Sequence, residues 1–177
     1  MTDSNEFLNN ALKRYEAAFD IEKPYEFHGR LFCAYARLSA SSEKYVLVKS
    51  ATLWRTESFE HVFFEKLKTL DGSKLDDIHL LMVDYMEPEL VREGKKYPGE
   101  DHMETFLSYV AVCENKVSPE IAAKIKSFKF VKNYLFTFRG RCEAHLIVAD
   151  LEEKKIYTNR YAGNMSAMYE EILNRNL

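Results

Sequence analysis

The stretch "FRGRCEAHLIVADLEEKKIYTNRYA", residues 138–162, decides the fold class. Its apolar, β-branched and aromatic residues fall into two runs on either side of the charged turn at residues 152–154, which predicts two strands joined by a tight connection. The helix-like run "NMSAMYEEILNR" comes next. The C-terminal part of the chain is therefore predicted to be a strand–strand–helix unit.

The same order is predicted twice more, working outward toward the N-terminus. In the first unit, strands "YEFHGRLFCAYARL" and "YVLVKSATLW" enclose a polar loop at residues 39–44, and "ESFEHVFFEKLKTL" is predicted to be a helix. In the second unit, residues 78–93 are a strand broken near Pro88, residues 103–115 are another strand, and Ser118 with Pro119 begins a short helix. A leading amphipathic helix starts near Asp3 or Ser4 and ends before Pro24.

We therefore predict one α+β domain over residues 1–177, in which a leading helix precedes three strand–strand–helix units. The strands would form an antiparallel-rich twisted sheet with helices on a face. Possible related hairpins span residues 25–54 and 133–161, because both contain Phe-x-Gly-Arg. Gly29 and Gly140 inside these segments indicate a bulge or a close approach of another backbone.

Composition limits the class of protein. Hydrophobic residues make up 46% and aromatic residues 14%, enough to fill a sizeable core. No apolar run approaches the roughly 20 residues that span a bilayer, and "MTDSNEFLNN" lacks the features of a signal peptide, so a cytosolic location with no membrane contact is expected. Cys33, Cys113 and Cys142 are expected to be buried thiols, since each lies in an apolar stretch.

Charge is unevenly distributed along the chain. The net charge of −3 argues against a generally basic nucleic-acid binder and leaves room for a local basic strip. Residues 57–104 hold thirteen acidic against six basic side chains, whereas residues 116–141 hold seven basic against one acidic. Such surfaces could pair within the fold or between copies, so a homo-oligomer or a protein partner is a possible consequence.

Glu114 and Lys116 form the most specific candidate site. On a continuing strand their side chains would share a face, and Glu-x-Lys resembles the Asp/Glu-x-Lys signature of the restriction-endonuclease-like superfamily. That resemblance implies a Mg²⁺- or Mn²⁺-dependent phosphodiesterase, with a further carboxylate from Glu104, Asp84 or Glu87. No Pro-Asp pair accompanies it, and Asn115 stands where an apolar residue is usual. We favour the simpler interpretation, that the strand ends at Cys113.

A second candidate is a polar strand face. Between Arg139 and His145 alternate residues are polar, including Arg141 and Glu143, which predicts a face that is either solvated or lines a groove. Arg30 on an equivalent face would place two arginines together for a phosphate or carboxylate. The favoured alternative is that both arginines pair with acids from residues 57–104.

The run "FTFRGRCEAHLIVADLEEKKIYTNRYAG", with "YVLVKSATLW" and "FLSYVAV", resembles a group of small uncharacterised bacterial cytosolic proteins. That resemblance implies a standalone domain and supplies no catalytic residues or cofactor. Three functions follow: a non-catalytic binding or regulatory module that self-associates, a metal-dependent nuclease-like phosphodiesterase, or a small anion-binding protein.

Overall fold

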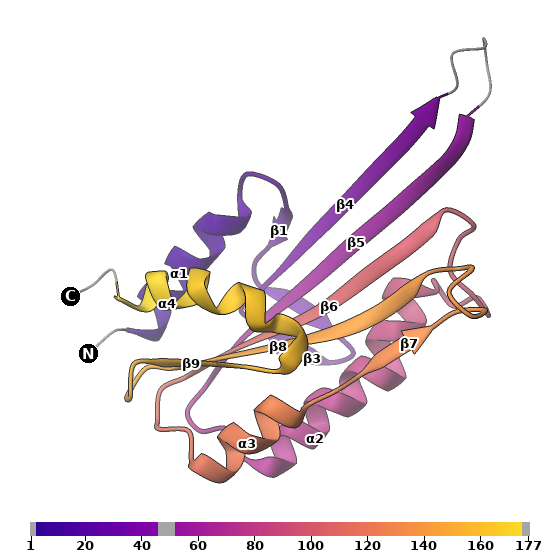
Figure 1. Ribbon diagram of the computed structural model, residues 1–177. Helices are drawn as coiled ribbons and strands as arrows, with labels where there is room; N and C mark the ends of the chain where they lie inside the picture. The colour runs from indigo at the N-terminus through magenta and orange to yellow at the C-terminus, as the bar shows by residue number, and fades with distance from the viewer. Residues whose placement is uncertain (1–2, 46–51, 175–177) are drawn as a thin grey trace.

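A mixed sheet forms the centre of the protein (Figure 1). The computed structural model describes residues 3–45 and 52–174. The strand order is β1-β4-β5-β6-β8-β7, and β9 also pairs with β8. The strands are β1 (Asp20–Glu22), β4 (Ala34–Tyr45), β5 (Thr52–Leu67), β6 (His102–Cys113), β7 (Val131–Asn133), β8 (Arg141–Asp150) and β9 (Lys155–Thr158). A separate hairpin joins β2 (Tyr25–Phe27) to β3 (Arg30–Phe32).

Three neighbouring inner strands run parallel, whereas the pairs that flank them are antiparallel. β5 pairs with β6 and β6 with β8 in parallel, and the β1–β4, β4–β5, β7–β8 and β8–β9 pairs are antiparallel. Seven successive residues at the end of β6 and nine at the end of β8 are buried, as expected for strands covered on both faces. The predicted α+β class with an antiparallel-rich sheet is confirmed.

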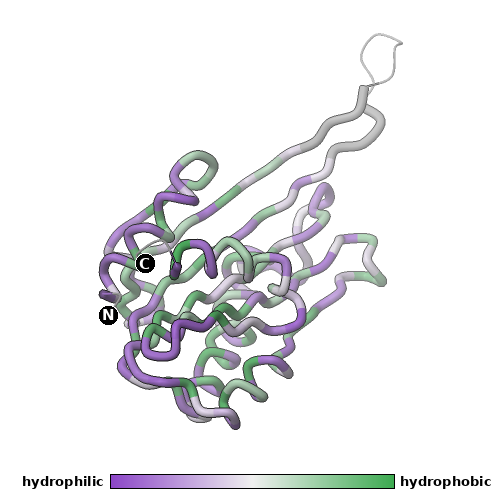
Figure 2. The backbone as a smooth tube through the Cα atoms, turned by 60° about the vertical axis from the view of Figure 1, so that its left-hand side comes forward, coloured by the Kyte–Doolittle hydropathy of each residue, from purple (hydrophilic) through white to green (hydrophobic). Residues whose placement is uncertain are grey.

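Helices cover both faces of the sheet. The α-helix α2 (Gly72–Leu81), the π-helix η1 (Met82–Val91) and α3 (Pro119–Ser127) lie on one face, and α1 (Ser4–Tyr15) and α4 (Ser166–Asn174) lie on the other (Figure 1). A 3-10 helix, η2 (Arg160–Met165), leads into α4. Neighbouring residues of β5 pack into different hydrophobic clusters. Phe63 packs into the cluster beneath α2, η1 and α3, and Phe64 packs into the cluster beneath α1 and α4. Figure 2 shows hydrophobic stretches of the chain gathered where strands and helices meet.

Two element predictions are wrong. The predicted helix at residues 57–70 is mostly the inner half of β5, and the predicted strand at residues 78–93 is the end of α2 followed by η1. Val62, Phe63 and Phe64 are all buried because helices cover both faces of β5, so an apolar cluster at helical spacing did not indicate a helix. Pro88 lies inside η1 and does not end it.

The three predicted units are consequently uneven. The first contains β4, β5 and α2, the third contains β8, β9 and α4, and the second has β6 and α3 without a return strand. The leading helix and the short helix capped by Ser118 are both confirmed. The polar segment at residues 39–44 is part of β4, and residues 46–51 of the predicted strand "YVLVKSATLW" lie outside the described residues.

The two Phe-x-Gly-Arg segments share a backbone feature. Gly29 has φ +69° and Gly140 has φ +72°, and each precedes an arginine that begins a strand. The surrounding topology differs, since Gly29 lies in the turn of the β2–β3 hairpin and Gly140 precedes the inner strand β8. The predicted close backbone approach exists at Gly140, where an added Cβ would lie 2.2 Å from the Met103 carbonyl oxygen.

The β4–β5 hairpin extends past the body of the protein (Figure 1). β6 pairs with β5 from Glu57 onward, and β1 pairs with β4 only between Tyr35 and Arg37. Within the described residues, the outer part of this hairpin therefore has only its own two strands as partners.

Candidate functional site

A polar pocket opens on the face of the sheet that carries α1 and α4. Its volume is about 400 Å³, and its floor comes from β5, β6 and β8 while η2 forms a wall. It is lined by Glu60, Phe106, Arg141, Glu143, His145, Arg160, Tyr161, Asn164 and Met165.

The alternation of β8 places three of these side chains side by side. Arg141, Glu143 and His145 are two residues apart, so they project from the same face of the strand. Further along that face, Ile147 and Ala149 belong to the hydrophobic cluster beneath α1 and α4. The predicted polar strand face therefore lines a pocket where the helices no longer cover the sheet.

A hydrogen-bonded network lies at the floor of the pocket. His145 Nε2 is 3.1 Å from Glu143 Oε1, and the Ser108 hydroxyl donates to Glu60 Oε1 at 2.8 Å. His145 Nδ1 is 3.5 Å from Ser108 Oγ, and the Phe106 ring stacks on the imidazole with centroids 4.8 Å apart. Glu143 and His145 are buried, with 8% and 6% of their surface exposed. Because each side chain is held by a neighbour, the floor presents fixed polar groups.

The arrangement of Ser108, His145 and Glu143 resembles a serine–histidine–acid relay. The burial and the hydrogen bonding of Ser108 nevertheless argue against nucleophilic catalysis. Ser108 is 0% exposed, so no substrate atom could reach its oxygen in this conformation. Its proton is directed to Glu60, whereas a nucleophilic serine would give its proton to histidine. This serine holds Glu60 in place.

Charges of both signs meet at the pocket. Burial raises the pKa of Glu60, and the hydrogen bond from Ser108 partly opposes that rise. Arg141 lies 3.8 Å from Glu104 and 3.9 Å from Glu143, distances too long for a close bidentate pair. Arg160 is exposed, and no ion pair joins it to the described part of the chain. Two guanidinium groups therefore border a pocket whose floor holds buried carboxylates.

The residues of the proposed metal site lie apart. β6 ends at Cys113, as favoured above, and Glu114 accepts a hydrogen bond from Ser4 Oγ at 3.1 Å. Lys116 is exposed and pairs with Glu153 at 2.7 Å. Glu104 is ten residues before Glu114 along β6, which corresponds to roughly 30 Å of extended strand.

The other two carboxylates do not complete the metal site either. Asp84 is exposed on η1, whereas Glu87 is 1% exposed and accepts hydrogen bonds from Arg92 and Tyr134. Lys132 Nζ lies 3.1 Å from Glu87 as well. Among residues 3–45 and 52–174, no three His, Cys, Asp or Glu residues are grouped so that they could hold a metal ion.

Arg30 and Arg141 do not converge. Arg30 makes two hydrogen bonds to Asp77 of α2, at 2.5 and 2.7 Å, while Arg141 borders the pocket on the other face of the sheet. The favoured pairing with acids from residues 57–104 is present at Arg30, which binds Asp77, whereas Arg141 lies 3.8 Å from Glu104 without a hydrogen bond between them.

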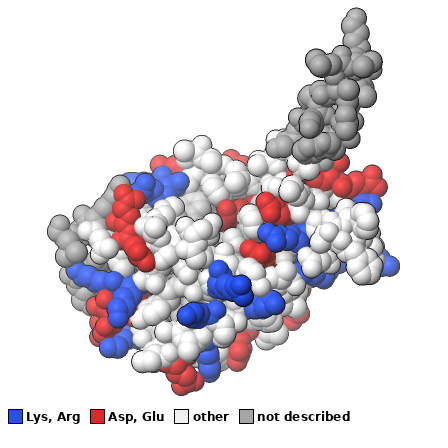
Figure 3. All heavy atoms as spheres, viewed as in Figure 1, with Lys and Arg blue, Asp and Glu red and all other residues white. Residues whose placement is uncertain are grey.

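The oppositely charged segments also meet within the fold. Lys132 pairs with Glu87, Arg139 with Glu100 and Arg141 with Glu104. Acidic and basic side chains are accordingly interspersed on the face that Figure 3 shows.

Sequence reasoning identified part of the pocket and missed the rest. Arg141, Glu143 and His145 were visible as an alternating polar face, but Glu60 was assigned to a helix. Ser108 and Arg160 carry no sequence signal of their own, because their roles depend on the pairing of β6 with β8 and on the position of η2.

The chain belongs to a family of proteins described as "Domain of unknown function (DUF8052)", which it matches over residues 3–171. This match agrees with the predicted resemblance to uncharacterised proteins, while the bacterial origin and the restriction-endonuclease-like similarity stay predictions. Comparison with curated proteins and with solved structures found no match. No helix in the described residues is both long and apolar enough to cross a membrane.

Proposed function

We propose that this domain is a binding module that takes a small organic anion in its polar pocket. The observation that carries the proposal is the position of Arg141 and Arg160 beside a buried, hydrogen-bonded Glu143–His145 pair. Neither arginine has a close bidentate partner, so the geometry leaves guanidinium N–H groups for a carboxylate or phosphate.

The floor of the pocket supports recognition of a second part of the ligand. Glu60 and Glu143 offer acceptor oxygens, and the stacked ring of Phe106 contributes an apolar surface. An inorganic anion would use only the arginines. An organic anion with hydroxyl or amino groups would use both the arginines and the floor, and it is the class that fits the lining best.

Thermal unfolding and calorimetric titration with succinate, malate and inorganic phosphate test this proposal. A ligand present at about one hundred times its dissociation constant adds about 2.7 kcal/mol, which raises Tm by roughly 5–10 °C for a chain of this length. Arg160→Gln removes one guanidinium without touching the core and should abolish the shift. Arg14→Gln is the matched control, because Arg14 is also a partly exposed arginine and pairs with Glu171 on the distant helix α4.

Two results would contradict the proposal. One is the absence of a shift with every anion in the panel. The other is an equal shift in wild type, Arg160→Gln and Arg14→Gln, since nonspecific ion effects would act on all three proteins alike.

We also propose self-association, on the basis of the exposed β7–β8 loop, whose neighbouring hollow shares Arg141 with the polar pocket. The β7–β8 loop exposes Phe136 and Phe138 by 93% and 85%, and Met103 is 53% exposed. Leu135, Phe136 and Thr137 all have positive φ, a conformation that costs L-residues about 1–2 kcal/mol each. Large aromatic side chains held outward on a strained loop are typical of a contact surface.

A second copy of the chain is the partner that this surface fits. A hollow of about 500 Å³ lies directly beside the loop and is lined in part by Met103 and Phe138. The same hollow is lined by Arg141 together with Glu100, Asp101 and Glu104. The patch therefore combines protruding aromatic side chains, a recess and charges of both signs. A twofold interface needs this self-complementarity, because the same patch must face itself.

Sedimentation velocity over a wide concentration range tests the association. Wild type should show a concentration-dependent dimer, and Phe136→Ser with Phe138→Ser should shift it to monomer. Leu31→Ser is the matched control, since Leu31 is 70% exposed on β3, away from this loop. A wild type that stays monomeric at every concentration, or a control that weakens the dimer equally, would refute the assignment.

A further inference from the structure

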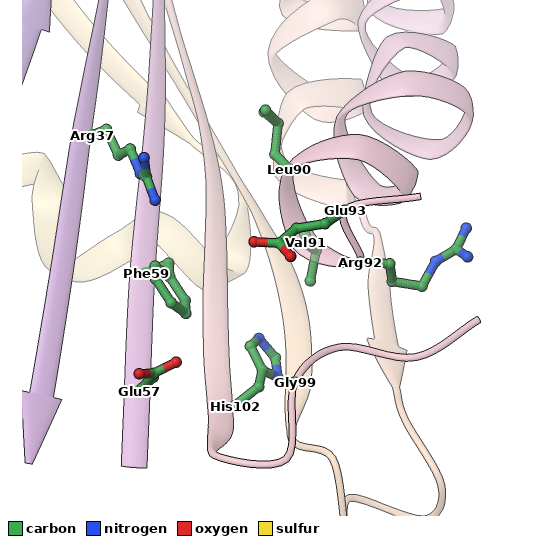
Figure 4. Close-up of a pocket in the computed structure, with 9 residues that line it drawn as sticks. All are labelled: Arg37, Glu57, Phe59, Leu90, Val91, Arg92, Glu93, Gly99 and His102. Carbon is green, nitrogen blue, oxygen red and sulfur yellow. The ribbon is translucent and has the colours of Figure 1, made fainter. Parts of the chain in front are cut away.

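A second pair of hollows lies on the opposite face of the sheet, between the β4–β5 hairpin and the end of η1. One has a volume of about 180 Å³ and is lined by Tyr35, Arg37, His61, Glu89, Leu90 and Glu93. The neighbouring hollow, of about 150 Å³, shares Arg37, Leu90 and Glu93 and reaches Phe59 and His102 (Figure 4). The two hollows adjoin at these shared residues, and together they are called the groove below.

His61 has an unsatisfied hydrogen-bonding atom beside this groove. The residue is 3% exposed, and its Nδ1 lies 2.6 Å from the Tyr35 hydroxyl. His61 Nε2 is buried and has no hydrogen-bond partner within the described residues. Burial raises the pKa of Tyr35 and lowers that of His61 to about 4, so at neutral pH a protonated phenol faces a neutral imidazole.

The tautomer of His61 decides which kind of group Nε2 lacks. In the tautomer in which the Tyr35 hydroxyl donates to Nδ1, the imidazole proton is on Nε2, and that N–H is a buried donor without an acceptor among the described residues. Such a group loses the free energy of the hydrogen bonds that it would make to water. An acceptor oxygen placed in the groove would recover that free energy.

Charges of opposite sign face each other across the groove. Arg37 reaches from β4 toward the helix, and the carboxylate of Glu93 points back toward the strands, whereas Arg92 points away (Figure 4). No ion pair joins these two described side chains. Lys95 donates a hydrogen bond to Glu93 Oε2 at 2.9 Å, which lowers the pKa of Glu93, and the charge of Arg37 adds to that lowering. Glu89, which lines the inner hollow, is already paired with His28 at 2.6 Å.

We propose that this groove binds a small zwitterion of the amino-acid type. Its carboxylate would lie at Arg37 and accept a hydrogen bond from His61 Nε2 once the imidazole shifts to expose that nitrogen, and its ammonium group would join Lys95 at Glu93. A ligand with both charges satisfies both walls at once, whereas a simple anion would be repelled by Glu93 and a simple cation by Arg37. This site is separate from the polar pocket, since His61 and Glu60 are adjacent in β5 and point to opposite faces of the sheet.

Imidazole NMR signals provide a direct test. The ¹⁵N-labelled protein is titrated at pH 7 with β-alanine, propionate and propylamine, which share a three-carbon chain and differ in their charged groups. β-Alanine should move the His61 Nε2 resonance with saturation. Propionate and propylamine should each bind about tenfold more weakly, because each lacks one charge-assisted contact.

Variants at the rim of the groove separate the two charges. Arg37 and Glu93 are exposed, so neither substitution removes a core contact. Arg37→Gln should abolish the response to β-alanine, and Glu93→Gln should make β-alanine and propionate bind equally. Arg14→Gln, on the other face, should behave as wild type.

Three results would overturn the inference. They are an unmoved His61 resonance at β-alanine concentrations that saturate any millimolar site, an unchanged response in Arg37→Gln, and equal binding of β-alanine and propionate by wild type. If β-alanine moves His145 instead of His61, the ligand occupies the polar pocket. That result also overturns the inference while leaving the proposal for the pocket intact.

Discussion

Gly140→Ala provides a sharp test of how the polar pocket is built. Gly140 immediately precedes Arg141, and its φ of +72° is a conformation that costs an L-residue about 1–2 kcal/mol. A Cβ there would also lie 2.2 Å from the Met103 carbonyl oxygen and 2.7 Å from that of His102. These are backbone atoms at the start of β6, and moving them disturbs the pairing of Glu104 with Arg141.

The size of the loss follows from these two effects. Overpacking of this kind adds about 1–3 kcal/mol, so Gly140→Ala should lower the free energy of unfolding by about 2–5 kcal/mol. Gly29→Ala is the matched control, because Gly29 has φ +69° with no atom within 4 Å of the added Cβ. It should lose only the conformational cost, about 1–2 kcal/mol.

Urea unfolding followed by circular dichroism measures both losses, provided that the denaturant slopes agree between the variants. Gly140→Ala should also weaken anion binding at the polar pocket, since Arg141 moves with the backbone, whereas Gly29→Ala should leave binding unchanged. Equal losses of stability in the two variants would refute the reasoning, because they would mean that the close approach to Met103 costs nothing.

Further predictions concern buried titratable groups and metal binding. Burial raises the pKa of Glu60 above its value in the unfolded chain, so the contribution of this group to stability is present at low pH and is lost as pH rises. The stability gain of Glu60→Gln over wild type should therefore be largest at neutral pH and shrink on acidification. A constant difference in urea unfolding from pH 4 to pH 8 would contradict this. The pKa of His61 is lowered from about 6.5 to about 4, so the contribution of this group to stability is complete above pH 6.5 and is lost as pH falls. Between pH 7 and pH 4 the free energy of unfolding of wild type should fall by about 3 kcal/mol relative to His61→Gln. Parallel pH profiles of the two proteins would rule this out. Burial alone would raise the pKa of Glu87, but hydrogen bonds from Arg92, Tyr134 and Lys132 outweigh burial and lower it. Glu87→Gln leaves Arg92 and Lys132 without their anion and should lower the free energy of unfolding by about 3 kcal/mol in chemical denaturation. A loss below about 1 kcal/mol would show that the buried anion is not needed. EDTA-stripped wild type and Glu114→Gln should have the same Tm with and without Mn²⁺, and a Mn²⁺-dependent rise confined to wild type would restore the metal-site interpretation.

Local rules predicted much of the fold. The hydrophobic spacing of α1 and the Ser118-Pro119 start of α3 identified two helices, because capping and periodicity are short-range effects. The apolar runs of β6 and β8 identified two strands for the same reason. The turn between β8 and β9 was also found, since charged residues interrupt two runs of strand-forming residues.

The errors fall where tertiary contacts override local pattern. Residues 57–67 carry apolar side chains at helical spacing, yet they form a strand because β4 and β6 pair with both of its edges. Residues 82–91 contain a proline and looked like a broken strand, yet they form a π-helix packed on the sheet. A single sequence does not reveal which neighbours will satisfy its backbone hydrogen bonds.

The candidate site shows the same division. The sequence alone determined that Arg141, Glu143 and His145 share one face of a strand, since side chains alternate with a period of two. It also favoured the interpretation that the strand ends at Cys113, before Glu114 and Lys116, and the structure decided for it. Only the tertiary structure decided that Ser108 lies between Glu60 and His145 and that Arg30 is on the opposite face from Arg141. It also decided that His61 lines a groove and that its Nε2 has no hydrogen-bond partner in the described part of the chain. The physical reason is that a site needs groups from several strands at hydrogen-bonding distance, and that distance is set by strand order and register, which depend on contacts between residues far apart in the chain.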